Sequence, residues 1–289
     1  MFTEESSQQI TPLAEQPGEP PAPSPGETIQ PTPPKLEWWA AWIDVVKAFG
    51  LWILSVVLLV FVPIIVAVPY IIYIWTKFGP PPPETLGADK TLLFLSIVAV
   101  FPTHLLTLLA IWLFVTRRGR EPFWKTVKFE WPENVGPVIG TLTSLLVAIV
   151  LLILAWLITQ FWGGNKTQLD LLIESSLPAR FATAFVAVVT APLVEELIYR
   201  GVLYSALEKA TGMIMAIILV SLLFAGVHVI QYFNNLSVIA AITLLSFTLT
   251  ITRAVTGKLL PCFIIHFVFN GIQAIALVVG PFVDKGGTG

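Results

Sequence analysis

Long apolar runs separated by short polar segments fill the chain after its first 34 residues. A run of about 20 apolar residues is long enough to cross the hydrocarbon core of a bilayer as a helix. The pattern therefore predicts an all-α fold, a polytopic transmembrane helical bundle of about seven spans. The spans are expected near residues 48–75, 91–116, 136–162, 181–207, 212–233, 236–253 and 258–281.

The segment before the first span divides into two parts. Residues 1–34 are rich in Pro, Glu, Gln, Ser and Thr and hold almost no large apolar side chains. Such a segment cannot bury enough surface to offset the entropy of ordering, so we predict a disordered Pro-rich tail. The next residues include Lys35, Trp38, Trp39 and Trp42, which predict a helix at the membrane interface because Trp rings favour headgroup depth.

Composition agrees with a membrane protein and argues against nucleic acid as a partner. The chain is 56% hydrophobic and 12% charged, and its net charge of −2 gives no reason to expect nucleic acid. The single cysteine, Cys262, excludes an internal disulfide and a cysteine-built metal site, and we interpret it as a small buried apolar residue. Lys and Arg concentrate on the side that holds the amino terminus, above all in residues 117–128. Since positive charge accumulates inside, we predict a multi-pass integral membrane protein with a cytoplasmic amino terminus.

The segment Ala191 to Gly201 breaks the apolar pattern of the fourth span with Glu195, Glu196 and Arg200. Each charge near a bilayer centre costs roughly 2.5 to 3.5 kcal/mol on insertion scales, so such groups face the bundle interior and have a partner. A helix places Glu196 and Arg200 on one face, whereas Glu195 points about 100° away from Glu196. We therefore expect Arg200 to neutralise Glu196 and to leave Glu195 available for another role.

Two later spans carry further polar side chains. The fifth span contains His228, four residues after Phe224, and the seventh contains His266 and Asn270 on one helical face. Each site alone is compatible with helix packing. Three costly sites on three helices are explained more simply by one shared pocket. We interpret His104, in the second span, as a hydrogen-bonded packing residue.

The three motifs Glu-Glu-x-x-x-Arg, Phe-x-x-x-His and His-x-x-x-Asn, on successive spans, together resemble a known signature. It is that of the CAAX-protease and bacteriocin-processing family of intramembrane proteases, also called the Abi family, which includes the prenyl-protein endoprotease of the endoplasmic reticulum. The resemblance covers roughly residues 180–275. It implies an intramembrane endopeptidase whose site contains Glu195, His228, His266 and Asn270, supported by Glu196 and Arg200. It further implies a catalytic membrane domain over residues 163–289, preceded by the tail (1–34) and by an interfacial helix with three spans (35–162).

Peptide hydrolysis needs an activated water, a stabilised oxyanion and a proton for the leaving amine. Glu195 suits the general base, His228 can hold the same water and deliver a proton, and His266 and Asn270 can donate to the oxyanion. The alternative is a zinc site, because Glu195, His228 and His266 form a two-histidine, one-carboxylate set. No His-Glu-x-x-His is present and Glu196 is already paired with Arg200, so we favour a site without metal, although the family is often labelled metalloprotease.

For His228 to reach Glu195, the fifth span should continue to about Asn234 or be displaced toward the cytoplasm. The partners expected are the lipid bilayer and a peptide or lipidated protein substrate, either a prenylated CAAX-type carboxyl terminus or a leader peptide. A non-catalytic membrane binding or bacteriocin-immunity protein with the same polar cavity is the alternative function. A transporter fits less well, because transporters usually have internal repeats with matched broken helices. The charged cluster has no counterpart around residues 50–160.

Overall fold

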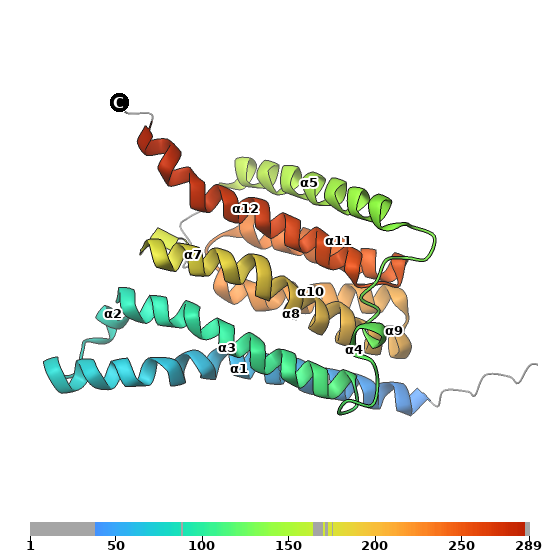
Figure 1. Cartoon of the computed structure of the whole chain (residues 1–289), viewed down its shortest axis with the longest axis horizontal. Coiled ribbons are helices and arrows are strands. Elements are labelled where there is room, and N and C mark those ends of the chain that lie inside the picture. The colour runs from blue at the N-terminus through green and yellow to red at the C-terminus, as the bar shows by residue number, and fades with distance from the viewer. Residues whose placement is uncertain (1–37, 88, 164–169, 171–172, 175, 287–289) are drawn as a thin grey trace, which may run out of the picture. The chain divides into compact units, whose positions relative to one another are not determined.

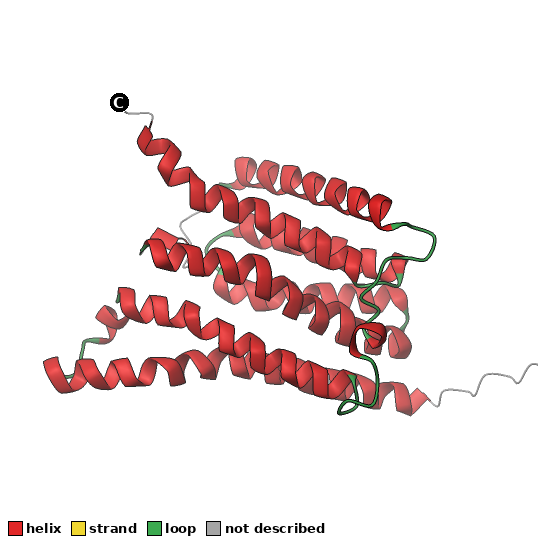
Figure 2. Cartoon of the chain, in the orientation of Figure 1, coloured by secondary structure: helices red, strands yellow, loops and turns green. Residues whose placement is uncertain are grey.

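The computed structural model describes residues 38–87, 89–163, 170, 173–174 and 176–286. The tail predicted as disordered, residues 1–34, lies outside these ranges. Within them the chain consists of helices and connecting turns, and no strand occurs in the described part (Figure 2). The all-α fold predicted from the apolar runs is therefore confirmed.

Each predicted span corresponds to one helix or to one unbroken run of helical segments. Six of these are long and apolar enough to cross a membrane among the described residues, and a seventh, with the apolar stretch Met213–Val229, is shorter. The chain is an integral membrane protein. The elements are α1 (Trp38–Phe78), α2 (Pro83–Leu86), α3 (Lys90–Val115), α4 (Phe123–Thr126), α5 (Pro137–Trp162), α7 (Leu177–Phe185), η1 (Val186–Thr190), α8 (Ala191–Glu196), η2 (Leu197–Leu203), α9 (Tyr204–Thr211), α10 (Met213–Gln231), α11 (Leu236–Thr256) and α12 (Leu260–Gly286).

The first helix is longer than its predicted span. α1 runs without a break from Trp38 to Phe78, so the segment predicted at the interface forms its first turns. The rings of Trp38 and Trp39 are 76% and 50% exposed there, as expected of side chains that face lipid or headgroups. Pro63 and Pro69 lie inside the helix and do not interrupt it.

The helical run from α7 to α9, Leu177–Thr211, occupies the middle of the bundle, and we call it the glutamate helix. Helices α1 and α3 pack on one side of it, and α10, α11 and α12 pack on the other (Figure 1). Helix α5 packs against α11 and α12 and completes that second side. The three motif-bearing segments, from the glutamate helix, α10 and α12, are therefore neighbours in space.

The junction between α9 and α10 sets the depth of the site. Gly212, with φ +84°, makes the turn that an L side chain rarely permits, and the two helices return antiparallel from it. Glu195 and His228 stand at nearly the same number of residues from Gly212, so they lie at similar depth. Of the two alternatives expected for this span, continuation to about Asn234 is not found, and displacement toward the cytoplasm stays a prediction. α10 ends at Gln231 because the Asn235 side chain accepts from Val238 N and starts α11.

One end of the bundle gathers α4, the α9–α10 junction and the α11–α12 turn (Figure 1). The loop after α4 is fastened there, since Leu259 N donates to Lys128 O at 2.9 Å and Lys258 Nζ lies 2.6 Å from Glu130 Oε1. This fixes the start of α12, the helix that carries His266. The exposed Lys and Arg of residues 117–128, which were predicted to face the cytoplasm, also lie at this end of the bundle. They belong to the segment that connects α3 to α5.

Candidate active site

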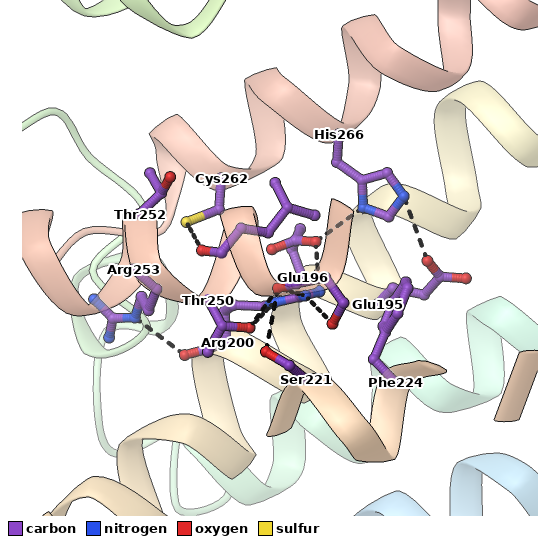
Figure 3. A network of polar contacts seen from close by, with 12 residues as sticks. Glu195, Glu196, Arg200, Ser221, Phe224, Thr250, Thr252, Arg253, Cys262 and His266 are labelled. Carbon is purple, nitrogen blue, oxygen red and sulfur yellow. Dashed lines mark hydrogen bonds and ion pairs between the residues drawn. The ribbon is translucent and has the colours of Figure 1, made fainter. Parts of the chain in front are cut away.

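Glu196 and Arg200 form the buried centre of the polar cluster. Both side chains are fully buried, and Arg200 Nη1 lies 3.0 Å from Glu196 Oε1 across one turn of the glutamate helix (Figure 3). The predicted pairing is therefore present. The low dielectric makes this pair strong and makes either partner costly to leave alone.

The remaining donors of Arg200 reach α11. Nη2 donates to both the carbonyl and the hydroxyl of Ser246, each at 2.9 Å, and Nε donates to Thr250 Oγ1 at 3.2 Å. The ring of Phe224 lies 4.7 Å from the guanidinium carbon. Sequence reasoning did not find Ser246 or Thr250. The signal was present, because Ser246, Thr250 and Arg253 follow one another at helical spacing along one face of an apolar helix.

His266 connects the two glutamates. Its Nδ1 lies 2.9 Å from Glu196 Oε1, and its Nε2 lies 3.6 Å from Glu195 Oε2 (Figure 3). A carboxylate paired with Arg200 can only accept, so Nδ1 is the nitrogen that carries the proton. The histidine is thereby oriented by Glu196, and Nε2 is directed to Glu195. This is the orienting role that a buried carboxylate performs for histidine in hydrolytic triads.

The adjacent glutamates differ in their surroundings. The side chain of Glu195 is 25% exposed, whereas that of Glu196 is fully buried. Glu195 also has no arginine or lysine within ion-pair distance among the described residues. The more accessible carboxylate is therefore the one that is not already engaged by a guanidinium, as the helical spacing predicted.

His228 reaches the cluster through Phe224. Its Nδ1 donates to the Phe224 carbonyl at 2.9 Å, because a carbonyl oxygen only accepts. A neutral ring in this arrangement has its lone pair on Nε2. The Phe224 ring stacks on His228 at 4.7 Å and meets His266 edge-on at 6.1 Å, so one aromatic side chain supports both histidines.

Asn270 makes a contact that the sequence did not predict. Its Nδ2 donates to the carbonyl oxygen of Ala187, in the π-helical segment η1, at 2.8 Å. Ala191 N bonds to Val186 O in the i to i−5 pattern, and the next donor in that pattern would be the nitrogen of Pro192, which has no hydrogen. The Ala187 carbonyl is thus left without its helical partner, and Asn270 satisfies it from α12.

A second π-helical segment follows the glutamates. In η2, Tyr204 N bonds to Tyr199 O, and the return to α-helical pairing leaves one carbonyl without a backbone donor. Arg253 Nε donates to the Arg200 carbonyl at 3.0 Å, and Arg253 also donates to Gly257 O and to Ser205 Oγ. Side chains of α11 and α12 thus satisfy both irregular parts of the glutamate helix.

Cys262 matches its interpretation as a buried residue. It is fully buried, and its Sγ lies 3.3 Å from the Leu249 carbonyl oxygen. The described residues contain no group of three or more His, Cys, Asp or Glu side chains arranged to hold a metal ion. The hydrogen bond between His266 Nδ1 and Glu196 leaves His266 Nε2 facing Glu195.

Comparison with known families identifies the segment that carries these motifs. Residues 177–272 match the family described as type II CAAX prenyl endopeptidase Rce1-like. The match begins at the first residue of α7 and contains every residue predicted for the site, so the resemblance inferred from the three motifs is confirmed. It indicates a membrane-embedded peptidase. No curated protein and no solved structure matches the chain.

Proposed function

We propose that the chain is an intramembrane endopeptidase of the CAAX prenyl endopeptidase type, with Glu195 as the general base. The observation that carries this proposal is the division of labour between the adjacent glutamates. Glu196 is fully buried and paired with Arg200 at 3.0 Å, whereas Glu195 is partly exposed beside His266 Nε2. A base must be free to take and release a proton, and only Glu195 meets that condition here.

In the proposed reaction, Glu195 takes a proton from a water molecule while the water oxygen attacks the carbonyl carbon of the scissile bond. His228 Nε2 accepts a hydrogen bond from the attacking water and so holds it in place. The tetrahedral intermediate carries an oxyanion. The C–N bond then breaks as the leaving nitrogen receives a proton from Glu195. The products are a new carboxyl end and a new amino end, and Glu195 returns to its starting state.

The oxyanion requires donors, which we assign to Asn270 and His266. Asn270 Nδ2 has two hydrogens, and the bond to Ala187 O uses one of them, so the second is available. His266 donates from Nε2 when its ring is protonated, with Glu196 held against Nδ1. A well-placed oxyanion donor is worth about 3 to 4 kcal/mol in such reactions.

The family match supports a substrate class. We propose a membrane-associated protein with a prenylated CAAX-type carboxyl terminus, with leader peptides as the other class to be tested. The amino terminus is proposed to be cytoplasmic, because the basic segment 117–128 follows α3 at the end of the bundle where α1 begins. That orientation is testable by cysteine labelling at loop positions.

The test is cleavage of a farnesylated CAAX peptide and of a leader-type peptide by the purified full chain in lipid nanodiscs, followed by mass spectrometry of the products. Glu195→Gln should lower the rate at least about 100-fold while the protein stays folded. Glu133→Gln is the matched control, because that side chain is 94% exposed and far along the chain from the motifs. Peptide binding without cleavage, equal in Glu195→Gln and parent, would instead favour a non-catalytic binding or immunity function.

A further inference from the structure

We infer that α1 and α3 act as a brace for the glutamate helix, with Trp52 and His104 as positioning residues of the peptidase reaction. Both helices lie outside residues 177–272, the segment that matches the peptidase family. Each nevertheless sends one polar side chain to the glutamate helix. The inference rests on the proposed function, because positioning is meaningful only if Glu195 reacts.

The first contact comes from α1. Trp52 Nε1 donates to the Tyr199 hydroxyl at 3.0 Å. Tyr199 is 6% exposed, and its ring meets Phe224 edge-on at 5.0 Å. Phe224 in turn supports His228 and His266 and lies against the Arg200 guanidinium. The indole of Trp52 therefore fixes the tyrosine that abuts the aromatic centre of the site.

The second contact comes from α3. His104 Nδ1 lies 2.8 Å from Thr190 Oγ1, and the Thr190 hydroxyl also lies 3.3 Å from its own Val186 carbonyl. The hydroxyl donates to that carbonyl and accepts from His104, so Nδ1 carries the proton. Thr190 is the last residue of η1, the segment that Asn270 holds from α12 through Ala187. This segment is thus held from both sides of the bundle.

The two contacts bracket the catalytic carboxylate along the chain. Thr190 lies before Glu195 and Tyr199 after it, with Glu196 also between the two anchor points and Arg200 directly after the second. The segment between them changes from π-helical to α-helical to π-helical pairing, and such irregular helices are common at functional sites and have fewer regular bonds to fix their register. External anchors on both sides are therefore able to set the direction of the Glu195 side chain.

Simple helix packing would also explain polar contacts between helices, and the two roles differ in what they change. A packing residue lowers the amount of folded protein when removed. A positioning residue lowers kcat per folded molecule with KM little changed, because the substrate still binds while the base is misplaced.

The experiment compares Trp52→Phe, Tyr199→Phe, His104→Leu and Thr190→Val with the parent in nanodiscs. Each is expected to lower kcat by about three- to tenfold while KM stays within about twofold. The two contacting pairs are also combined as double variants, Trp52→Phe with Tyr199→Phe and His104→Leu with Thr190→Val. The loss of kcat in each double variant should be no larger than that in the worse of its two single variants. His104→Asn should recover most of the activity, because its side-chain nitrogen takes the place of Nδ1. Trp42→Phe, on the same helix but 45% exposed, is the control expected to keep kcat.

A readout independent of turnover accompanies the kinetics. Hydrogen exchange of the amides in residues 186–203 should accelerate in Trp52→Phe and His104→Leu and remain at the parental rate in Trp42→Phe. Unchanged kcat and unchanged exchange in both variants would overturn the brace. Failure of the proposed function is recognised separately, as full activity of Glu195→Gln or as no cleavage by the parent, and the exchange measurement still decides the brace in that case.

Discussion

Asn270 on α12 donates its side-chain amide to the backbone carbonyl of Ala187, 2.8 Å away. That carbonyl has lost its helical partner because Pro192 carries no N–H. Asn270 was expected only to donate to the oxyanion. It also supplies the hydrogen bond that the irregular helix carrying the glutamates lacks. Its two N–H groups allow both roles.

Replacing Asn270 with Leu should destabilise the protein by about 1 to 3 kcal/mol, because a partly buried carbonyl loses its donor. Pro192→Ala supplies a backbone N–H at the missing position. The double variant should therefore recover part of the stability that Asn270→Leu loses. Thermal unfolding in detergent measures all four proteins. Strictly additive losses would show that Ala187 O does not depend on Asn270.

The adjacent glutamates should differ in their effect on stability. Glu196→Gln removes the countercharge of a fully buried Arg200, and leaving such a charge unpaired costs about 3 to 5 kcal/mol. Glu195→Gln should leave the unfolding temperature near that of the parent, because no guanidinium depends on it. Equal losses of stability in the two variants would contradict the division of labour proposed for them.

Gly140 is required by the ring of Trp131. A Cβ at this position would lie 2.5 Å from Trp131 Cε3, so Gly140→Ala must displace the ring and the loop after α4. We expect a loss of about 1 to 3 kcal/mol, typical of overpacking. Gly136→Ala is the control, since a Cβ there meets nothing within 4 Å. Thermal unfolding measures the loss of stability, and tryptophan fluorescence measures the displacement of the Trp131 ring. A Gly140→Ala protein unchanged in both would refute the contact.

The loop after α4 should become less firmly held at acidic pH. The hydrogen bond and the charge of Lys258 hold the pKa of Glu130 below its ordinary value of 4.5. A lowered folded pKa means that the stabilisation is complete above that ordinary value and is lost as the pH falls through the folded pKa. The difference in unfolding temperature between the parent and Lys258→Met should therefore shrink as the pH is lowered from about 6 to about 3.

Glu133→Gln serves as the control for this titration. Glu133 lies 4.0 Å from Lys258 and is 94% exposed, so the control protein should show the same pH dependence as the parent. A difference between parent and Lys258→Met that stays constant with pH would mean that the ion pair does not couple the loop to α12.

Local periodicity was sufficient for the features that lie within one helix. Apolar runs predicted the seven helical segments, and the spacing of Glu196 and Arg200 predicted their ion pair. Helical geometry also predicted that the Glu195 side chain points away from that pair. These inferences succeed because the geometry of a helix is set by the backbone and does not depend on neighbouring helices.

Contacts between helices were decided by the tertiary structure. No pattern within one helix tells which carbonyl an arginine or asparagine on another helix will reach, so Ser246, Thr250 and the Ala187 carbonyl were not predicted as partners. The fifth span does not continue to Asn234, the first of the two alternatives expected for it, because a local cap at Asn235 starts the next helix, while the hairpin at Gly212 already matches the depths of Glu195 and His228.

The sequence by itself thus determined which residues are chemically exceptional, since charged and imidazole side chains in apolar spans are costly wherever the helices pack. Only the tertiary structure decided which partners they contact. It places His266 against both glutamates, and it brings Trp52 and His104 from the amino-terminal helices to the glutamate helix. The physical reason is that side-chain type fixes the cost of burial, whereas the partner that offsets it is chosen by packing.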